Sequence, residues 1–118
     1  MDVIGPEGRL LARLMSASTL RARELNQNVA NQNTPGYKRR TVEFEDMLRR
    51  ALQSPRPNLD PIRPVVREDP AAPADPNGNN VTMELELNAL TENRLMYEMY
   101  AAILGGRLDI VRSAIEER

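Results

Sequence analysis

The sequence contains no cysteine, no histidine and no tryptophan, and only one phenylalanine in 118 residues. Without cysteine it has no disulfide, no thiolate nucleophile and no thiolate metal ligand. Without histidine it lacks the commonest general base and the commonest transition-metal ligand. We therefore expect a protein that is not an enzyme and that holds neither a metal nor a cofactor.

The sequence also lacks long hydrophobic runs and a strong net charge. No apolar stretch approaches the roughly 20 residues that span a bilayer, and the N-terminus has no basic and apolar signal for cleavage. The 16 basic and 17 acidic residues nearly cancel, so nothing attracts nucleic acid or an anionic membrane globally. We expect no nucleic-acid partner and no membrane insertion. A cytoplasmic location is the direct interpretation, although export without cleavage would leave the same sequence.

The apolar residues that are present are mainly aliphatic and recur at helical spacing, which predicts one all-α domain over residues 1–118. The first segment predicts a helix over residues 6–33, because Pro6 suits a first helical turn and no further proline occurs before Pro35. Its apolar stripe steps by three or four residues and includes Leu11, Leu14, Leu25 and Val29.

The strongest periodic signal predicts a second long helix over residues 82–117. Its apolar positions alternate steps of three and four over four heptads, as in the seam of a coiled coil. We expect the two long helices to pack as a coiled-coil-like pair and the seams to pack subunits together. The C-terminal positions concerned are Leu87, Leu90, Tyr97, Ala101, Leu104, Leu108, Val111 and Ile115. A second apolar line, Met96, Met99, Ile103 and Ile110, would need a further partner helix.

The middle segment, residues 34–80, holds eight of the nine prolines. Each proline removes a backbone donor and restricts the residue before it, so we expect a largely irregular connection. Apolar residues at helical spacing predict one short helix near residues 42–53. The basic triplet Lys38-Arg39-Arg40 is interpreted as solvated surface.

An asparagine-rich stretch ends the first predicted helix. Asparagine is a poor helix former but a good helix cap, and Pro35-Gly36 fits the centre of a type II turn, where glycine supplies the positive φ. From these residues alone, a polar helix cap followed by a turn is the simplest interpretation. The positions of interest are Asn28, Ala30, Asn31, Asn33, Thr34, Pro35, Gly36 and Tyr37.

This stretch resembles a signature that flagellar rod, hook and hook-associated proteins carry at the end of their N-terminal helix: alanine-asparagine, two intervening residues, then threonine-proline-glycine-tyrosine. A second run, residues 77–86 with Asn93 and Tyr97, is similar to the flagellar basal-body rod protein family, and to its proximal-rod members in particular. The resemblance covers residues 11–40 and 77–115 and leaves the middle segment uncovered.

The resemblance implies a structural subunit that self-assembles through its terminal helices into a helical tube, the drive shaft of the flagellum. It implies as partners other rod subunits, the rod base with the MS ring, and the export gate. It also implies a place in the periplasmic rod, reached by flagellar type III export without a cleaved signal. The alternative is a cytoplasmic coiled-coil adaptor or export chaperone, which has no evident need for the asparagine-rich signature.

Overall fold

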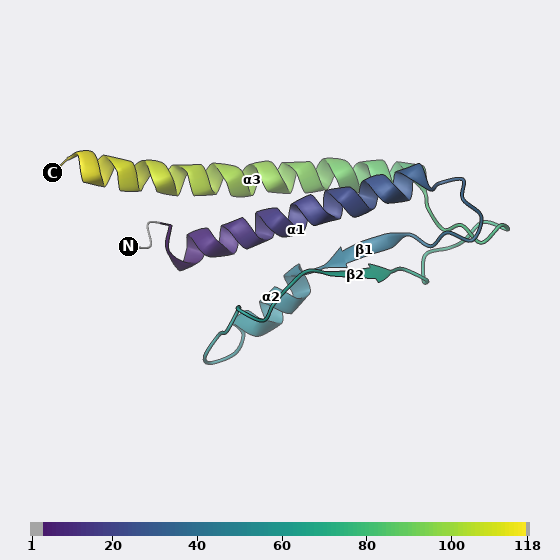
Figure 1. Cartoon of the computed structure of the whole chain (residues 1–118), viewed down its shortest axis with the longest axis horizontal. Helices are drawn as coiled ribbons and strands as arrows, with labels where there is room; N and C mark the ends of the chain where they lie inside the picture. Colours follow the sequence, from purple (N-terminus) through teal and green to yellow (C-terminus); the bar gives the residue numbers. More distant parts are fainter. Residues whose placement is uncertain (1–3, 118) are drawn as a thin grey trace.

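The computed structural model describes residues 4–117, which form an elongated molecule of 67 × 31 × 17 Å. Two long helices lie side by side and run in opposite directions, and a smaller arm lies along the other side of the first (Figure 1). We define the arm as residues 40–68. The elements in chain order are α1 (Gly5–Ala30), β1 (Arg40–Glu43), α2 (Glu45–Leu52), β2 (Val65–Glu68) and α3 (Met83–Glu116).

The two long terminal helices of the sequence analysis are confirmed. Helix α1 carries Pro6 in its first turn and ends at Ala30, where the backbone N–H of Asn31 caps the last turn by donating to the carbonyl of Gln27 at 3.0 Å. Helix α3 follows Thr82, whose extended backbone sets the start of the helix. The ends therefore lie where proline and the polar caps interrupt the apolar periodicity.

The predicted all-α fold is confirmed only in part: the chain is mostly helical, but β1 and β2 form a two-stranded antiparallel sheet that the prediction lacked. Val42 lies opposite Val66 in the register. These β-branched residues favour extended backbone, and the five residues between Pro64 and Pro70 leave β2 room to pair. The middle segment is therefore more regular than its proline content indicated.

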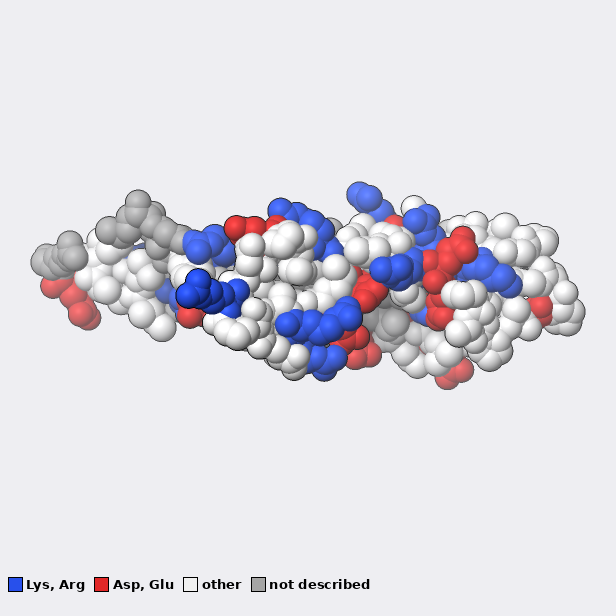
Figure 2. Space-filling view, turned by 90° about the horizontal axis from the view of Figure 1, so that it is seen from below, with Lys and Arg blue, Asp and Glu red and all other residues white. Residues whose placement is uncertain are grey.

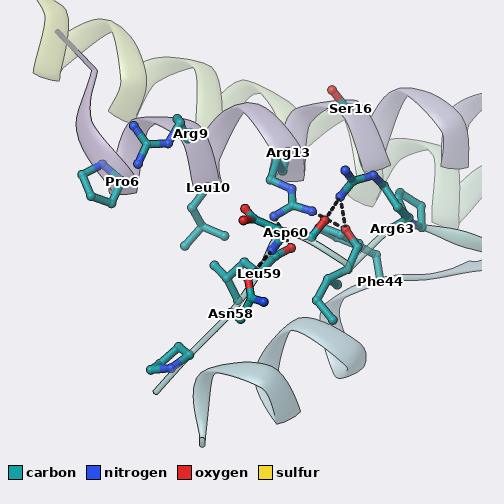
Figure 3. Close-up of a pocket in the computed structure, with 13 residues that line it drawn as sticks. Pro6, Arg9, Leu10, Arg13, Ser16, Phe44, Asn58, Leu59, Asp60 and Arg63 are labelled. Atoms are coloured by element: carbon teal, nitrogen blue, oxygen red, sulfur yellow. Dashed lines mark hydrogen bonds between the residues drawn. The ribbon is translucent and has the colours of Figure 1, made fainter. Parts of the chain in front are cut away.

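The short helix α2 confirms the predicted helix near residues 42–53. It packs the arm against α1 through a small core of Ala17, Phe44 and Leu48, to which Leu10, Leu14, Leu59 and Ile62 contribute partly buried side chains. Figure 3 shows Arg13 reaching from α1 toward the loop at residues 58–60. Arg13 and this loop line a cavity of about 680 Å³. The Arg13 guanidinium donates to the backbone carbonyls of Leu59 and Ile62, which holds this proline-rich loop against α1.

Helix α3 packs on α1 along a line that differs in part from the predicted seam. Its buried residues are Glu86, Asn93 and Tyr100, spaced by seven, each one position before a predicted seam position, whereas the predicted Leu90, Leu104 and Val111 are partly buried. None of the helices in the described part of the chain combines the length and hydropathy that crossing a membrane requires. Charges of both signs are interspersed on the face that Figure 2 shows.

Candidate functional site: a polar junction between the helix ends

The asparagine-rich signature folds into a buried polar junction where α1 ends and α3 begins. Asn28, in the last two turns of α1, is fully buried and uses its whole carboxamide. Its Nδ2 donates to the Arg40 carbonyl at 2.9 Å and to Glu86 Oε2 at 3.2 Å. Its Oδ1 accepts from the Arg40 N–H at 2.9 Å and from the Tyr37 hydroxyl at 3.0 Å. Asn28 thus pairs with the backbone of β1 as a neighbouring strand would.

A buried ion pair joins α3 to the same junction. The carboxylate of Glu86 is 1 % exposed and accepts from Arg39 Nε at 2.6 Å. Arg39 also donates from Nη1 to Asp69 Oδ2 at 2.8 Å. The hydrogen bond to Glu86, and then that to Asp69, raise the pKa of Arg39 above its ordinary value against the effect of burial. The hydrogen bond from Arg39 lowers the pKa of Asp69, so both groups stay charged at neutral pH.

The predicted turn after α1 is confirmed. The N–H of Tyr37 donates to the Thr34 carbonyl at 3.2 Å, and Gly36 has a φ of 75°, as a type II turn requires at its third position. The loop before α3 seals this turn. Asn79 Nδ2 donates to the carbonyls of Asn31 and Thr34, both at 2.8 Å. Two sequence runs about 45 residues apart therefore close on each other.

Glycine is required where the two runs meet. Gly78 has a φ of 88°, and a Cβ built on it would lie 3.3 Å from the Cα of Gly36. The N–H of Gly36 donates to the Asn77 carbonyl at 2.9 Å, which fixes the two loops at this separation. A side chain on Gly78 would force them apart.

The remaining signature residues lie at the surface of the junction. Asn31 and Tyr37 are partly buried, whereas Ala30, Asn33, Thr34, Pro35 and Gly36 are exposed. Burial raises the pKa of the Tyr37 phenol above its ordinary value. The exposed members shape the turn, and the backbone groups of Thr34 and Gly36 also hydrogen-bond to the loop before α3.

The predicted subunit-packing residues divide into two groups. All four of those on α1, and four of the eight on α3, lie at least partly buried within the chain. These are Leu11, Leu14, Leu25 and Val29 on α1, and Leu90, Ala101, Leu104 and Val111 on α3. Leu87, Tyr97, Leu108 and Ile115 are exposed. The first group packs the two helices of one chain, and the second is available to a neighbour.

Sequence reasoning missed the junction's acidic and basic members. Arg39 was interpreted as solvated surface and is instead paired and partly buried. Asn80, 2 % exposed, accepts from the Arg39 N–H at 2.6 Å. One sequence feature could have indicated the junction. Glu86 precedes Asn93 by seven residues, so both polar side chains lie on the same face of α3.

Replacing Tyr37 with phenylalanine tests how tightly the signature is coupled. The hydroxyl is lost while the ring remains, so Asn28 Oδ1 keeps only the Arg40 N–H. We expect the free energy of unfolding, measured by urea denaturation, to fall by about 1 kcal/mol. The matched control is Tyr97→Phe, at a tyrosine that is 39 % exposed, which should change stability far less. Equal effects of the two substitutions would contradict the assignment.

Comparison with known proteins identifies the family. A flagellar basal body rod protein FlgB from Cereibacter sphaeroides is 32 % identical over 102 residues, which cover 78 % of this chain and 80 % of that protein. The chain belongs to the FlgB family of flagellar basal-body rod proteins. FlgB of Yersinia ruckeri is 27 % identical over 111 residues, or 79 % of this chain and 81 % of that protein. FlgB of Bacillus subtilis is 24 % identical over 119 residues, or 89 % of each chain. No family model matches the sequence.

Membership in the FlgB family makes the chain a structural component of the flagellar rod and not an enzyme. In this FlgB-family chain the polar junction performs no chemistry. It fixes the angle and register at which α1 and α3 leave their common end, through Asn28, Glu86 and Asn79. Because buried polar networks are satisfied in one arrangement only, they specify geometry more than they add stability.

Proposed function

We propose that this chain is a subunit of the proximal rod that assembles with copies of itself and with other rod subunits into a helical tube. In this proposal it reaches the periplasmic rod through the flagellar export apparatus without cleavage of its N-terminus. Its partners at the base of the rod are then the MS ring and components of the export gate. The proposal rests on family membership together with the exposed surface of α3.

The observation that carries the proposal is the distribution of exposed apolar side chains. Within residues 4–117, every exposed large apolar residue except Leu52 lies on α3. They are Leu85, Leu87, Leu95, Met96, Tyr97, Met99, Ile103, Leu108, Ile110 and Ile115. Exposed apolar surface of this extent indicates an interaction face. Helix α1 lies between α3 and the arm (Figure 1), so both of its sides are covered, whereas only one side of α3 is.

One line on this surface has the spacing of a helix-packing seam. Leu85, Met96, Met99, Ile103 and Ile110 fall on one side of α3, at steps of three, four, seven or eleven. A helix from a neighbouring subunit would bury such a line. This supports assembly through the terminal helices, with the polar junction holding α3 in place.

Placing charge on this line tests the proposal. Met99 and Ile103 are 46 % and 47 % exposed, so the double variant Met99→Glu/Ile103→Glu should fold with unchanged helix content in circular dichroism. Burying two unpaired carboxylates in a subunit interface is strongly unfavourable, so we expect loss of motility and loss of the protein from purified basal bodies.

The matched control is Gln53→Glu/Asn58→Glu, which adds the same charge at two exposed positions of the arm and should incorporate normally. Normal incorporation of the α3 variant would contradict assembly through this line. A wild-type protein that stayed in the cytoplasm and was absent from basal bodies would instead support the adaptor or chaperone.

A further inference from the structure

Two grooves flank the contact between α1 and α3 near the middle of the helices. Their volumes are about 440 and 340 Å³, and both are lined by Ser18 of α1 and Asn93 of α3. The larger groove is otherwise lined by Thr19, Ala22, Leu90, Thr91, Arg94 and Tyr97. The α1 side of this groove is formed by the small residues Ser18, Thr19 and Ala22. Their short side chains leave an opening beside the buried polar atoms of Ser18 and Asn93.

Those polar atoms are not satisfied within the described chain. Ser18 is 1 % exposed and Asn93 is 7 % exposed. Among residues 4–117, Ser18 Oγ and Asn93 Oδ1 are buried without a hydrogen-bond partner. The amide of Asn93 is already oriented, since Nδ2 donates to the Ser18 carbonyl at 2.8 Å. A buried polar atom without a partner is costly, so this pair is suited to a group supplied from outside.

The chemistry of the groove defines its occupant. An amide oxygen only accepts, so the occupant must present a hydrogen-bond donor to Asn93 Oδ1. The groove walls at Ala22, Leu90 and Tyr97 require apolar side chains on both sides of that donor. Arg94 Nε on the rim lies 4.0 Å from Glu98 Oε1 of the same helix, and the Arg94 side chain remains largely exposed, so its charge can still attract a further carboxylate.

The chain itself carries a segment with this composition. Asn88 is an exposed amide on α3, with the exposed side chains of Leu85 and Leu95 one and two helical turns away. Glu92, also exposed, lies one turn from Asn88 and would face Arg94. We propose that Asn88 of one copy enters the larger groove of a second copy and donates a hydrogen bond to Asn93 Oδ1.

This inference rests on the proposed function, in which copies of the chain assemble, and it names the surfaces that meet. At 3.6 residues per turn, the Asn88 side of α3 lies roughly 140° around the helix from the groove side. The contact therefore joins two different surfaces, the Asn88 side of α3 and the groove. In a dimer, one copy keeps a free groove and the other keeps a free Asn88 side. Such heterologous contacts propagate into an open array and do not close a two-fold dimer.

Cysteine cross-linking tests the contact, because the chain has no cysteine of its own. Purified Asn88→Cys and Thr91→Cys variants, each with a different tag, are mixed at a concentration where the wild-type chain self-associates by sedimentation, and are oxidised with diamide. Both positions are exposed, and Thr91 lies in the groove. We expect a mixed disulfide dimer, because the contact would bring the two Cα atoms within disulfide range. Asp46→Cys, on the exposed face of α2, replaces Asn88→Cys in the control and should give none.

The other possible results of this experiment distinguish an error in the groove contact from an error in self-association. Wild-type association without the mixed cross-link overturns the groove contact and leaves assembly through α3 intact. Cross-linking of Asn88→Cys with itself indicates a two-fold contact and also overturns the groove. An absence of wild-type association overturns the second copy as occupant and, with it, the self-association in the proposed function.

Two further variants measure the hydrogen bonds. Asn88→Ala should weaken self-association about tenfold, the equivalent of one hydrogen bond, without changing the melting temperature of the monomer. Ser18→Ala removes the other unpartnered polar atom of the pair, a hydroxyl that would donate to the amide oxygen of the entering Asn88. It should also weaken association, and it should not lower the monomer's melting temperature. If both variants associate as wild type, the proposed contact is wrong.

Discussion

Replacing Glu86 with alanine is expected to lower the free energy of unfolding by about 3–5 kcal/mol, the range typical of breaking one side of a buried ion pair. The substitution leaves Arg39 without its buried partner and removes one of the two acceptors of Asn28 Nδ2, the other being the Arg40 carbonyl. It also leaves a cavity between α3 and β1, because Glu86 is among the largest fully buried side chains of the molecule. Urea denaturation of the purified chain, followed by circular dichroism, measures the loss.

The matched control is Glu84→Ala, two residues earlier in the same first turn of α3. Glu84 is exposed, so its loss should change stability by no more than about 0.5 kcal/mol. A double-mutant cycle with Arg39→Met isolates the coupling between the two charges. If Glu86→Ala lowered the free energy of unfolding as little as Glu84→Ala does, the buried ion pair of Glu86 would not stabilise the junction.

The long helices could be predicted from the sequence because their signal is local. Proline at position 6, the asparagine cap at position 31 and a 3.6-residue period are all contained within the segment that they describe. The turn at residues 34–37 is local for the same reason, since Pro35 and Gly36 favour its backbone angles without help from elsewhere.

The small sheet could not be predicted because its signal is not local. Each strand has only four residues, and β2 lies within a segment whose prolines indicate irregular structure. The pairing of Val42 with Val66 depends on the α2 core bringing two stretches together. Single-sequence periodicity contains no information on such a partner.

The seam on α3 was displaced for a different reason. Counting apolar positions gives Leu87, Leu108 and Ile115 the same weight as Leu90 and Leu104, although only the latter two lie toward α1. The line that faces α1 includes Glu86 and Asn93, which an apolar count excludes. A helix with apolar residues on several sides has no unique inward face by pattern alone, and here buried polar partners on α1 and β1 determine it.

Replacing Phe44 with alanine is expected to detach the arm while leaving the paired helices folded. Phe44 is 1 % exposed and fills the core that joins α2 to α1 at Ala17. Truncating a buried phenylalanine costs about 3–5 kcal/mol, whereas the α1–α3 contact includes none of its atoms. Local stability should therefore fall in the arm alone. Hydrogen exchange should show lost protection in β1 and α2, and limited proteolysis should cleave residues 53–64 faster.

Leu52→Ala is the control for this last experiment, since Leu52 lies on the same helix as Leu48 but is 46 % exposed. It should leave exchange in the arm near that of the wild type. Loss of protection throughout α3 in the Phe44 variant would show instead that the arm and the helix pair unfold together. The arm would then be needed to hold α1 and α3, because the junction at Asn28 and Glu86 could not keep them paired without the core that joins α2 to α1 at Ala17.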